Sequence, residues 1–211
     1  SDTTIDGKMA EVIYNAHPGK IYRIANVDFE VDSTTQLGKD IASTKSESLL
    51  KVKSNYNLDV ILNERDRIDN DLKNKGYYYF SPDHLLVEVD STGGDHEVDM
   101  YVTVKPETPG KAKEPQKIGN IFIYPNYRQT SEGFRTTRPR ANQLFDDQYY
   151  IIDPQNTYRK RVLANHIFFN KGDTYTRWEH NRTISHLVNL NAFKFVKNTF
   201  VDNPDSANTM D

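Results

Sequence analysis

The sequence contains an internal repeat, which constrains the fold more than any other feature. Residues 23–29 read Arg-Ile-Ala-Asn-Val-Asp-Phe, and residues 117–123 read Lys-Ile-Gly-Asn-Ile-Phe-Ile. Further matches follow in the same order at larger offsets: 49–50 with 168–169, Tyr56 with Tyr175, Ile68 with Ile184, Leu72 with Val188, and 76–77 with 192–193. Matches that keep their order indicate two copies of one structural unit rather than a single large core.

The repeat divides the chain into units. We predict a complete unit over residues 20–107, a linker over 108–115 and a second unit over 116–211. The linker is rich in Pro, Gly and charged residues, which is typical of a boundary. The charge balance also changes there, because residues 1–110 carry 12 Lys or Arg and 20 Asp or Glu, whereas the rest of the chain carries 15 and 10. Two bodies with different surfaces are therefore expected.

Both ends of the chain are expected to hold partial units. Residues 8–16 alternate like residues 98–105, the last strand of the first unit, so we expect residues 1–19 to contain the final strand of a preceding unit. The second unit carries an insertion at about 127–157 and is expected to lack its last strand. We hypothesise that residues 8–16 fill this gap from a neighbouring molecule.

Hydrophobic periodicity predicts the order strand, helix, helix, strand, strand in each unit. In the first unit the expected strands are 22–31, 85–90 and 98–105, and the expected helices are 35–43, with an interruption at Gly38, and 58–75. In the second unit the expected strands are 116–124 and 193–201, and the helices are 159–169 and 177–190. The face of the longest helix expected to be buried consists of Leu58, Ile61, Leu62, Ile68 and Leu72. The fold class is therefore α+β, with a three-stranded sheet packed under two helices.

Composition excludes several classes of protein. No apolar run approaches the ~18 residues that a membrane-spanning helix needs. The chain has no cysteine, which excludes disulfides, thiolate metal sites and a cysteine nucleophile. The first residues lack the charged and apolar regions of a signal peptide.

The sequence gives little sign of catalytic or cofactor chemistry. The six His residues do not have the spacing of a metal site, and no phosphate-binding loop or nucleophile motif occurs. We expect no catalytic residue, no metal and no cofactor. The alternative hypothesis of an enzyme that uses paired carboxylates is supported only by the abundance of Asp. The Lys and Arg residues of 128–161 are too sparse for a nucleic-acid surface, so no nucleic-acid partner is expected.

Several strings, taken in order, carry a resemblance to a known family: Ile21-Tyr22-Arg23-Ile24, Ser48-Leu49-Leu50-Lys51-Val52, Asn63-Glu64-Arg65-Asp66-Arg67-Ile68, Lys75-Gly76-Tyr77-Tyr78-Tyr79-Phe80, Gly172-Asp173-Thr174-Tyr175 and Leu190-Asn191-Ala192-Phe193-Lys194-Phe195-Val196. With the order of elements, they resemble POTRA domains, the periplasmic repeats of the BamA/TamA family of outer-membrane assembly factors. The strings look like the lipoprotein branch of Bacteroidetes called TamL. Two positions depart from the family pattern. Lys53 opens a turn that usually holds a glycine, and Ala192 replaces the glycine that ends the second helix.

The resemblance implies a periplasmic, outer-membrane-associated protein that is not an enzyme. The implied partners are nascent outer-membrane or secreted proteins, a downstream β-barrel of the same protein and other subunits of the assembly machinery. The outer membrane itself would be reached through parts of the protein outside this chain. Such a protein would act as a scaffold and weak peptide-binding platform.

In POTRA domains the second strand is the edge implicated in binding extended peptides. The corresponding residues here are Leu85, Leu86, Val87, Glu88, Val89 and Asp90. We expect weak binding there by β-augmentation, in which a peptide adds a strand to the sheet. An alternative reading is that Pro82, Glu88 and Asp90 only protect this edge from aggregation. A further alternative is a secreted glycan- or protein-binding module built of α+β repeats, which the 13 Tyr residues would suit.

Overall fold

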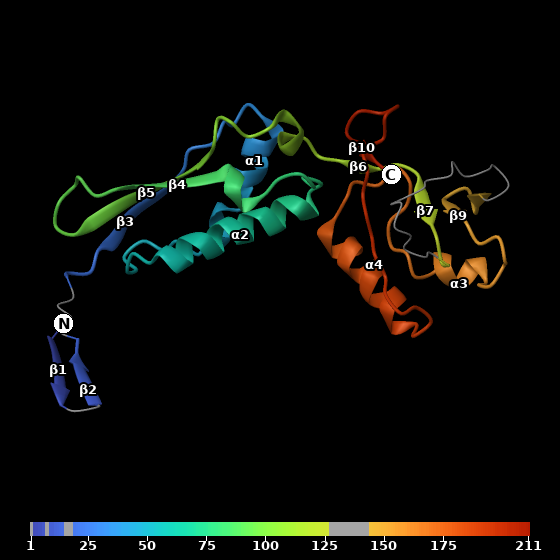
Figure 1. The fold of residues 1–211 in the computed structure, drawn as a ribbon. Coiled ribbons are helices and arrows are strands. Elements are labelled where there is room, and N and C mark those ends of the chain that lie inside the picture. The colour runs from blue at the N-terminus through green and yellow to red at the C-terminus, as the bar shows by residue number, and fades with distance from the viewer. Residues whose placement is uncertain (1, 7–8, 15–18, 127–143) are drawn as a thin grey trace.

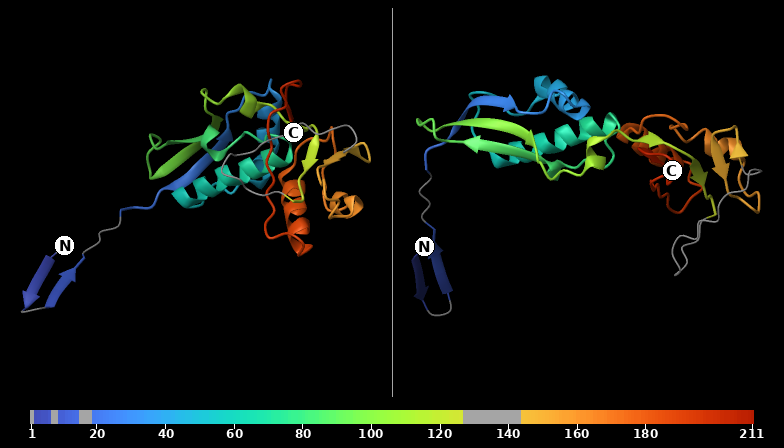
Figure 2. Two further views of the ribbon diagram at one scale, coloured as in Figure 1. Left: turned by 45° about the vertical axis from the view of Figure 1, so that its right-hand side comes forward. Right: turned by 90° about the horizontal axis from the view of Figure 1, so that it is seen from above.

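The structure is a computed structural model that describes residues 2–6, 9–14, 19–126 and 144–211, with residues 2–6 and 9–11 as backbone only. It shows two α+β units joined end to end, with a small hairpin ahead of the first (Figure 1). Two further views show the same elongated arrangement (Figure 2).

The sheet of the first unit has its last strand in the middle. Its strands are β3 (Arg23–Phe29), β4 (Leu85–Asp90) and β5 (Glu97–Val104). They lie in the order β3-β5-β4, with β5 parallel to β3 and antiparallel to β4. Alternate residues of β5, namely Val98, Met100 and Val102, are buried. This alternation matches the sequence prediction and turns one face of the sheet toward the helices.

Two helices supply the rest of the first core. α1 (Gln36–Ser43) begins after Thr35 and α2 (Leu58–Asn74) begins after Asn57, and each of these two side chains caps the first turn of its helix. A short 3₁₀ helix, η1 (Lys45–Glu47), follows α1. The buried helical residues join those of the sheet in one cluster: Leu37, Ile41, Ile61, Ile68, Leu72, Ile24, Phe29, Leu85, Val98, Met100 and Val102.

Gly38 does not interrupt α1, so that part of the prediction is wrong. The helix runs through it to Ser43. A Cβ atom at this position would lie 1.9 Å from the carbonyl oxygen of Asp32. The glycine therefore lets the preceding turn pack against the helix, which explains a residue that helix propensity disfavours.

The buried face of α2 differs from the predicted one. Ile61, Ile68 and Leu72 are buried as expected, but Leu58 and Leu62 are exposed. Glu64 is fully buried instead. The stripe that faces the sheet thus accommodates a carboxylate between apolar residues, and a buried carboxylate requires partners.

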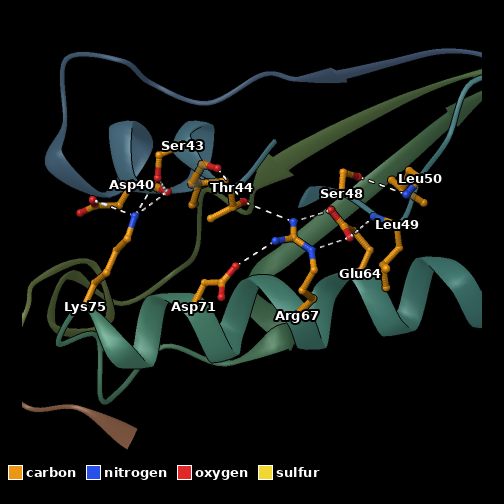
Figure 3. Close-up of polar contacts among 11 residues, drawn as sticks. Asp40, Ser43, Thr44, Ser48, Leu49, Leu50, Glu64, Arg67, Asp71 and Lys75 are labelled. Carbon is orange, nitrogen blue, oxygen red and sulfur yellow. Dashed lines mark hydrogen bonds and ion pairs between the residues drawn. The ribbon is translucent and has the colours of Figure 1, made fainter. Parts of the chain in front are cut away.

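Glu64 has such partners in the Leu49 amide and the Arg67 side chain (Figure 3). Its carboxylate accepts a hydrogen bond from the Leu49 amide at 2.8 Å and pairs with the Arg67 guanidinium at 2.7 Å. Arg67 also contacts Asp71 at 2.8 Å and the Thr44 hydroxyl at 3.3 Å. Burial raises the pKa of Glu64, but the bonds from Arg67 and Leu49 outweigh it and hold the pKa below its ordinary value of 4.5. The network ties α2 to the loop after α1.

The second unit repeats the backbone hydrogen bonds of the first. The Tyr56 amide donates to the Tyr22 carbonyl at 2.8 Å, and the Tyr175 amide donates to the Gln116 carbonyl at 2.9 Å. Three further bonds from a backbone amide to a carbonyl have a counterpart in the second unit. Ile24 to Ser54 matches Ile118 to Asp173, Lys53 to Ile24 matches Gly172 to Ile118, and Arg23 to His96 matches Lys117 to Asn208. Apart from His96 and Asn208, which lie beyond the matched strings, these residues keep the offsets of the sequence repeat, so the two copies share one local geometry.

The described elements of the second unit are β6 (Lys117–Ile118), β7 (Ile121–Ile123), β8 (Leu144–Phe145), β9 (Tyr149–Ile151), α3 (Lys160–Ala164), α4 (Arg177–Asn189) and β10 (Thr209–Met210). β10 lies parallel to β6, as β5 lies parallel to β3. It therefore supplies the first two residues of the strand that we expected this unit to lack. The insertion at 127–157 lies partly outside the described residues, and its described part forms β8 and β9.

The strand predicted over residues 193–201 is not formed. In the first unit the equivalent strand, β4, pairs with β5 along its whole length. In the second unit the antiparallel contact is confined to the end of the segment, where Val201 exchanges backbone hydrogen bonds with Asp211 and Asp202 bridges Met210. Among the described residues, no strand lies opposite the rest of the segment, so it forms no ladder. Phe193 and Phe200 nevertheless pack against the second core.

Two other predicted elements are shorter than expected. The strand 116–124 is divided into β6 and β7, since the Asn120 amide donates to the Asp211 carboxylate at 2.8 Å rather than to a strand. β7 then pairs in parallel with β9, which belongs to the insertion. The helix predicted over 159–169 is confined to the five residues of α3.

The N-terminal hairpin consists of β1 (Asp2–Asp6) and β2 (Met9–Ile13), which pair antiparallel. Their order and direction match those of β4 and β5. The hypothesis that residues 8–16 complete the second unit of a neighbouring molecule stays a prediction, because β2 pairs with β1 on one side as β5 pairs with β4.

The segment between the units is packed rather than loose. It contains a short 3₁₀ helix, η3 (Gly110–Lys113), and Thr108, Ala112 and Gln116 are buried. The Gln116 amide donates to the carbonyl of Gly76 at 2.9 Å. A Cβ on Gly76 would lie 2.7 Å from Thr174, so this glycine allows the end of α2 to approach the second unit closely.

Ring and charge contacts complete the joint between the units. The Tyr78 ring meets those of Tyr175 and Phe200 edge-on, with centroids 5.0 and 5.2 Å away. Arg177, at the start of α4, contacts the buried carboxylate of Asp69 on α2 at 3.2 Å. The two units are therefore held by both apolar and ionic contacts.

A turn substitution tests the repeat. Lys53 has a φ of 70°, and its counterpart Gly172 has a φ of 92°. A side chain in this region costs about 1–2 kcal/mol, so Lys53→Gly should raise the free energy of unfolding by about 0.5–1 kcal/mol. The reciprocal Gly172→Lys, which meets no atom within 4 Å, should lower it. Urea denaturation measures both, and equal effects of the same sign would contradict the equivalence.

The Glu64 network makes a second prediction. Glu64→Gln should lower the free energy of unfolding by about 1–3 kcal/mol at neutral pH, because Arg67 then lacks its charged partner. The pKa of Glu64 is lowered in the folded state, so its contribution is full above 4.5 and is lost as the pH falls through the lowered value. The stability difference should therefore shrink in acid. Glu107→Gln, at an exposed position outside the network, is the control and should show little effect.

Candidate functional site

β4 is an open edge of the first sheet. It pairs with β5 from Leu85 opposite Val104 to Asp90 opposite Asp99. In the part of the chain that the structure describes, no strand pairs with its other side, where only the Leu85 amide has a backbone partner. The predicted site residues, Leu85, Leu86, Val87, Glu88, Val89 and Asp90, thus lie together at a sheet edge. Such an edge presents unpaired amides and carbonyls.

The register identifies which backbone groups point outward. The Lys105 amide donates to the His84 carbonyl, which places residue 84 in a hydrogen-bonded position facing β5. Because these positions alternate along an antiparallel pair, Leu86 and Glu88 face β5, whereas Val87 and Val89 face outward. The Leu85 amide is taken by the Pro82 carbonyl. The free outward groups are therefore the amides of Val87 and Val89 and the carbonyls of residues 85, 87 and 89.

The start of β4 is fixed by α2. The 3₁₀ helix η2 (Pro82–His84) precedes the strand, and the Pro82 carbonyl accepts two hydrogen bonds from Arg65, at 2.8 and 2.6 Å. Arg65 also contacts Asp83 at 3.1 Å. A shallow groove lies here, lined by Leu62, Arg65, Asp66, Pro82 and Asp83. The edge is thus a rigid, preformed backbone template, which lowers the entropy cost of binding.

The outer surface of this edge is acidic and partly apolar. Leu86 and Val89 are exposed, Glu88 lies opposite Tyr101, and Asp90 lies opposite Asp99. Desolvation, followed by the nearby carboxylates Asp99 and Asp90, raises the pKa of the Tyr101 phenol. An extended peptide with basic side chains would suit this surface.

The second unit does not offer the same edge. Its equivalent residues, 195–201, form no strand, and Val201 exchanges two backbone hydrogen bonds of 2.8 Å with Asp211. The candidate site is therefore a property of the first unit. Sequence reasoning missed the groove at the start of β4, because the helical period placed Leu62 on the buried face of α2, whereas this side chain is exposed.

Other kinds of site find no counterpart among the described residues. No group of three or more His, Asp or Glu side chains is arranged to hold a metal there. Within the same ranges, no helix is both long and apolar enough to cross a membrane. His180 is half-buried, and its pKa is lowered by burial and by the charge of Arg177, which fits a neutral side chain packed at the joint.

Comparisons with known proteins identify the architecture. No protein-family model matches the chain, and no curated protein matches its sequence. Among solved structures, the chain is similar to Haemophilus influenzae BamA POTRA domains 3–5, with a TM-score of 0.53 and 10% identity, covering 90% of this chain and 59% of that one. It is also similar to Haemophilus ducreyi BamA lacking POTRA domains 1–3, with a TM-score of 0.60 and 10% identity, covering 90% of this chain and 28% of that one. The chain has the POTRA fold.

The POTRA fold confirms the predicted α+β class and accounts for the position of β4. The chain spans less than two thirds of the length of either of these BamA structures. In the first POTRA unit the central strand is β5, so β3 and β4 are its edges. β3 is partly covered near its start by the bridge from Arg23 to Asn55, which leaves β4 as the longer free edge.

Amide hydrogen exchange tests this geometry in the free protein. The amides of Leu86 and Glu88, which face β5, should exchange at least about tenfold more slowly than those of Val87 and Val89, which face solvent. NMR-detected exchange resolves the four amides individually. Equal protection of all four would show that another segment covers the edge of β4.

Proposed function

We propose that this chain is part of a periplasmic scaffold in outer-membrane protein assembly, and that the edge of β4 holds extended segments of client proteins. The observation that carries the proposal is the open, preformed edge of the first POTRA unit. The similarity to BamA POTRA structures supports it. An extended peptide would add to β4 by β-augmentation.

The proposed binding is weak because few groups take part. Two amides and three carbonyls face outward on β4, so a peptide gains up to five backbone hydrogen bonds. Each contributes about 0.5–1.5 kcal/mol, and ordering the peptide offsets much of the total. Dissociation constants of about 0.1–1 mM are expected. Weak, backbone-directed binding suits a chaperone that must release its client.

The proposed partners follow from this role. They are nascent outer-membrane or secreted proteins, a β-barrel domain elsewhere in the same protein, and other subunits of the assembly machinery. Contact with the outer membrane belongs to parts of the protein outside this chain. We also propose membership of the TamL-like lipoprotein branch, which rests on the sequence strings that begin at Ile21. The protein then acts without catalysis or cofactor.

An NMR titration of the full chain tests the proposal. The probe is a peptide of alternating apolar and basic residues, and the control is a peptide of the same length with two central prolines, which cannot form a ladder. The largest amide shifts should occur at Val87 and Val89 and should saturate at about 0.1–1 mM peptide. Shifts spread over the helices, or identical shifts with the proline peptide, would contradict the proposal.

Two variants separate backbone from side-chain recognition. Val89→Pro removes an outward amide without removing a bond to β5, which edge strands tolerate. It should weaken peptide binding at least about threefold, whereas Val89→Thr, which keeps the amide, should change it less than about twofold. Equal losses in both variants would indicate that the valine side chain, rather than the strand edge, binds the peptide.

A further inference from the structure

A stripe of aromatic and basic side chains runs along α4 on the surface of the second unit. This α4 stripe consists of Phe168, Trp178, Arg182 and His186. The Arg182 guanidinium lies 3.9 Å from the ring centre of Phe168 and 4.8 Å from that of Trp178. The His186 ring meets the Phe168 ring edge-on, with 4.7 Å between their centres. Because Trp178, Arg182 and His186 are spaced four residues apart, they lie on one face of the helix.

The second helix of each unit has the same register against the loop that precedes it. In the first unit the Leu49 amide donates to the Glu64 carboxylate at 2.8 Å, and in the second the Phe168 amide donates to the Thr183 hydroxyl at 3.1 Å. The residues of the second pair lie 119 positions after those of the first, an offset that the sequence repeat already contains. The first turns of α2 and α4 can therefore be compared position by position.

The first unit shows that this face of the helix is turned to solvent when the sheet has all three strands. The shared register places Trp178 at the position of Asp59 and Arg182 at the position of Asn63. Both residues of the first unit are exposed, although they belong to a unit with a three-stranded sheet. Trp178 is itself 59% exposed. The α4 stripe therefore occupies positions that stay accessible in a complete unit.

The α4 stripe carries a positive charge that its surroundings do not neutralise. Three carboxylates of the first unit are absent from the corresponding positions: Glu47 is replaced by His166, Asp59 by Trp178 and Glu64 by Thr183. Among the described residues, Arg182 has no ion-pair partner and donates no side-chain hydrogen bond. By contrast, Arg67 of the first unit pairs with both Glu64 and Asp71. The charge of Arg182 is thus available to an outside partner.

The two aromatic rings hold the Arg182 guanidinium without using its hydrogen-bond donors. Aromatic rings attract a cation through their faces, and the five N–H groups of the guanidinium remain for other acceptors. The fork that these groups form matches the two oxygens of a carboxylate. Because the rings already restrict the arginine side chain, less conformational entropy is lost when an anion binds to it.

We propose that the α4 stripe docks an acidic segment of a partner protein, with a carboxylate on Arg182 and an apolar side chain against the Trp178 ring. Trp and Arg are among the residue types that most often dominate the binding energy of an interface. One guanidinium suits one carboxylate, whereas attraction to a membrane surface typically needs a cluster of about four to eight Lys or Arg residues. The stripe adds a second binding surface to the scaffold and does not involve β4, so either proposal can fail without the other.

The fluorescence of Trp178 tests the proposal, because this residue is the single tryptophan of the chain. The probe for the full chain is a peptide of about ten residues in which Asp and Glu flank a central Leu, and the control peptide has Asn and Gln in their place. The acidic peptide should change the emission in a saturable way and bind at least about tenfold more tightly than the control peptide. Equal binding of both peptides would overturn the proposal, because charge would then play no part.

Substitutions of Arg182 assign the effect to its guanidinium. Arg182→Gln should weaken binding of the acidic peptide at least about tenfold, and Arg182→Lys, which keeps the charge but loses the fork, at least about threefold. Arg23→Gln removes the same charge from an exposed position of the first unit and should change binding less than about twofold. Unchanged circular dichroism confirms that the variants fold. Full affinity in Arg182→Gln would contradict the proposal.

Two further titrations distinguish other occupants of the α4 stripe. If vesicles of phosphatidylglycerol change the emission of Trp178 and the acidic peptide does not, the stripe binds a membrane surface. If dilution of the protein alone changes the emission and the acidic peptide does not, the stripe binds a second copy of the chain. Either result would overturn the proposal of an acidic partner protein.

Discussion

The position of the last strand governs the rest of the structure. In the first unit, β5 lies between β3 and β4 and pairs with both. These two strands therefore form a sheet only through the last strand of the unit. The second unit shows the consequence directly. Its strand β10 is two residues long, and the segment 193–201 is irregular although it has the composition of a strand. The same strand order leaves β4 at an edge, because β4 pairs with β5 on one side and its other side is free.

Sequence patterns predicted what depends on local periodicity. The alternation of β5 and the order of elements in the first unit follow from residue spacing, and the structure has them. The candidate strand Leu85–Asp90 also has the predicted bounds. The position of this strand at an edge depends on the strand order, which alternation alone does not determine. The resemblance to POTRA domains predicted that position.

The failures came from contacts between distant residues. The buried Glu64 carboxylate is stabilised by Arg67 and the Leu49 amide, and residue spacing alone does not predict such a network. Leu58 and Leu62 were expected inside because they share the helical period, but both are exposed, whereas Ile61 is buried. The linker over 108–115 is rich in Pro, Gly and charged residues, and yet it is packed, because the joint between the units forms where it meets the end of α2. Tertiary contacts override composition at each of these places.

The central claim is that the edge of β4 accepts a strand, and intermolecular nuclear Overhauser effects in a peptide complex test it most directly. Contacts between peptide Hα or amide protons and the amides of Val87 and Val89 would show a strand paired with β4. The account predicts a ladder of such contacts at every second residue of the peptide. Contacts only with side chains of α2 or α4, and none with those two amides, would contradict it.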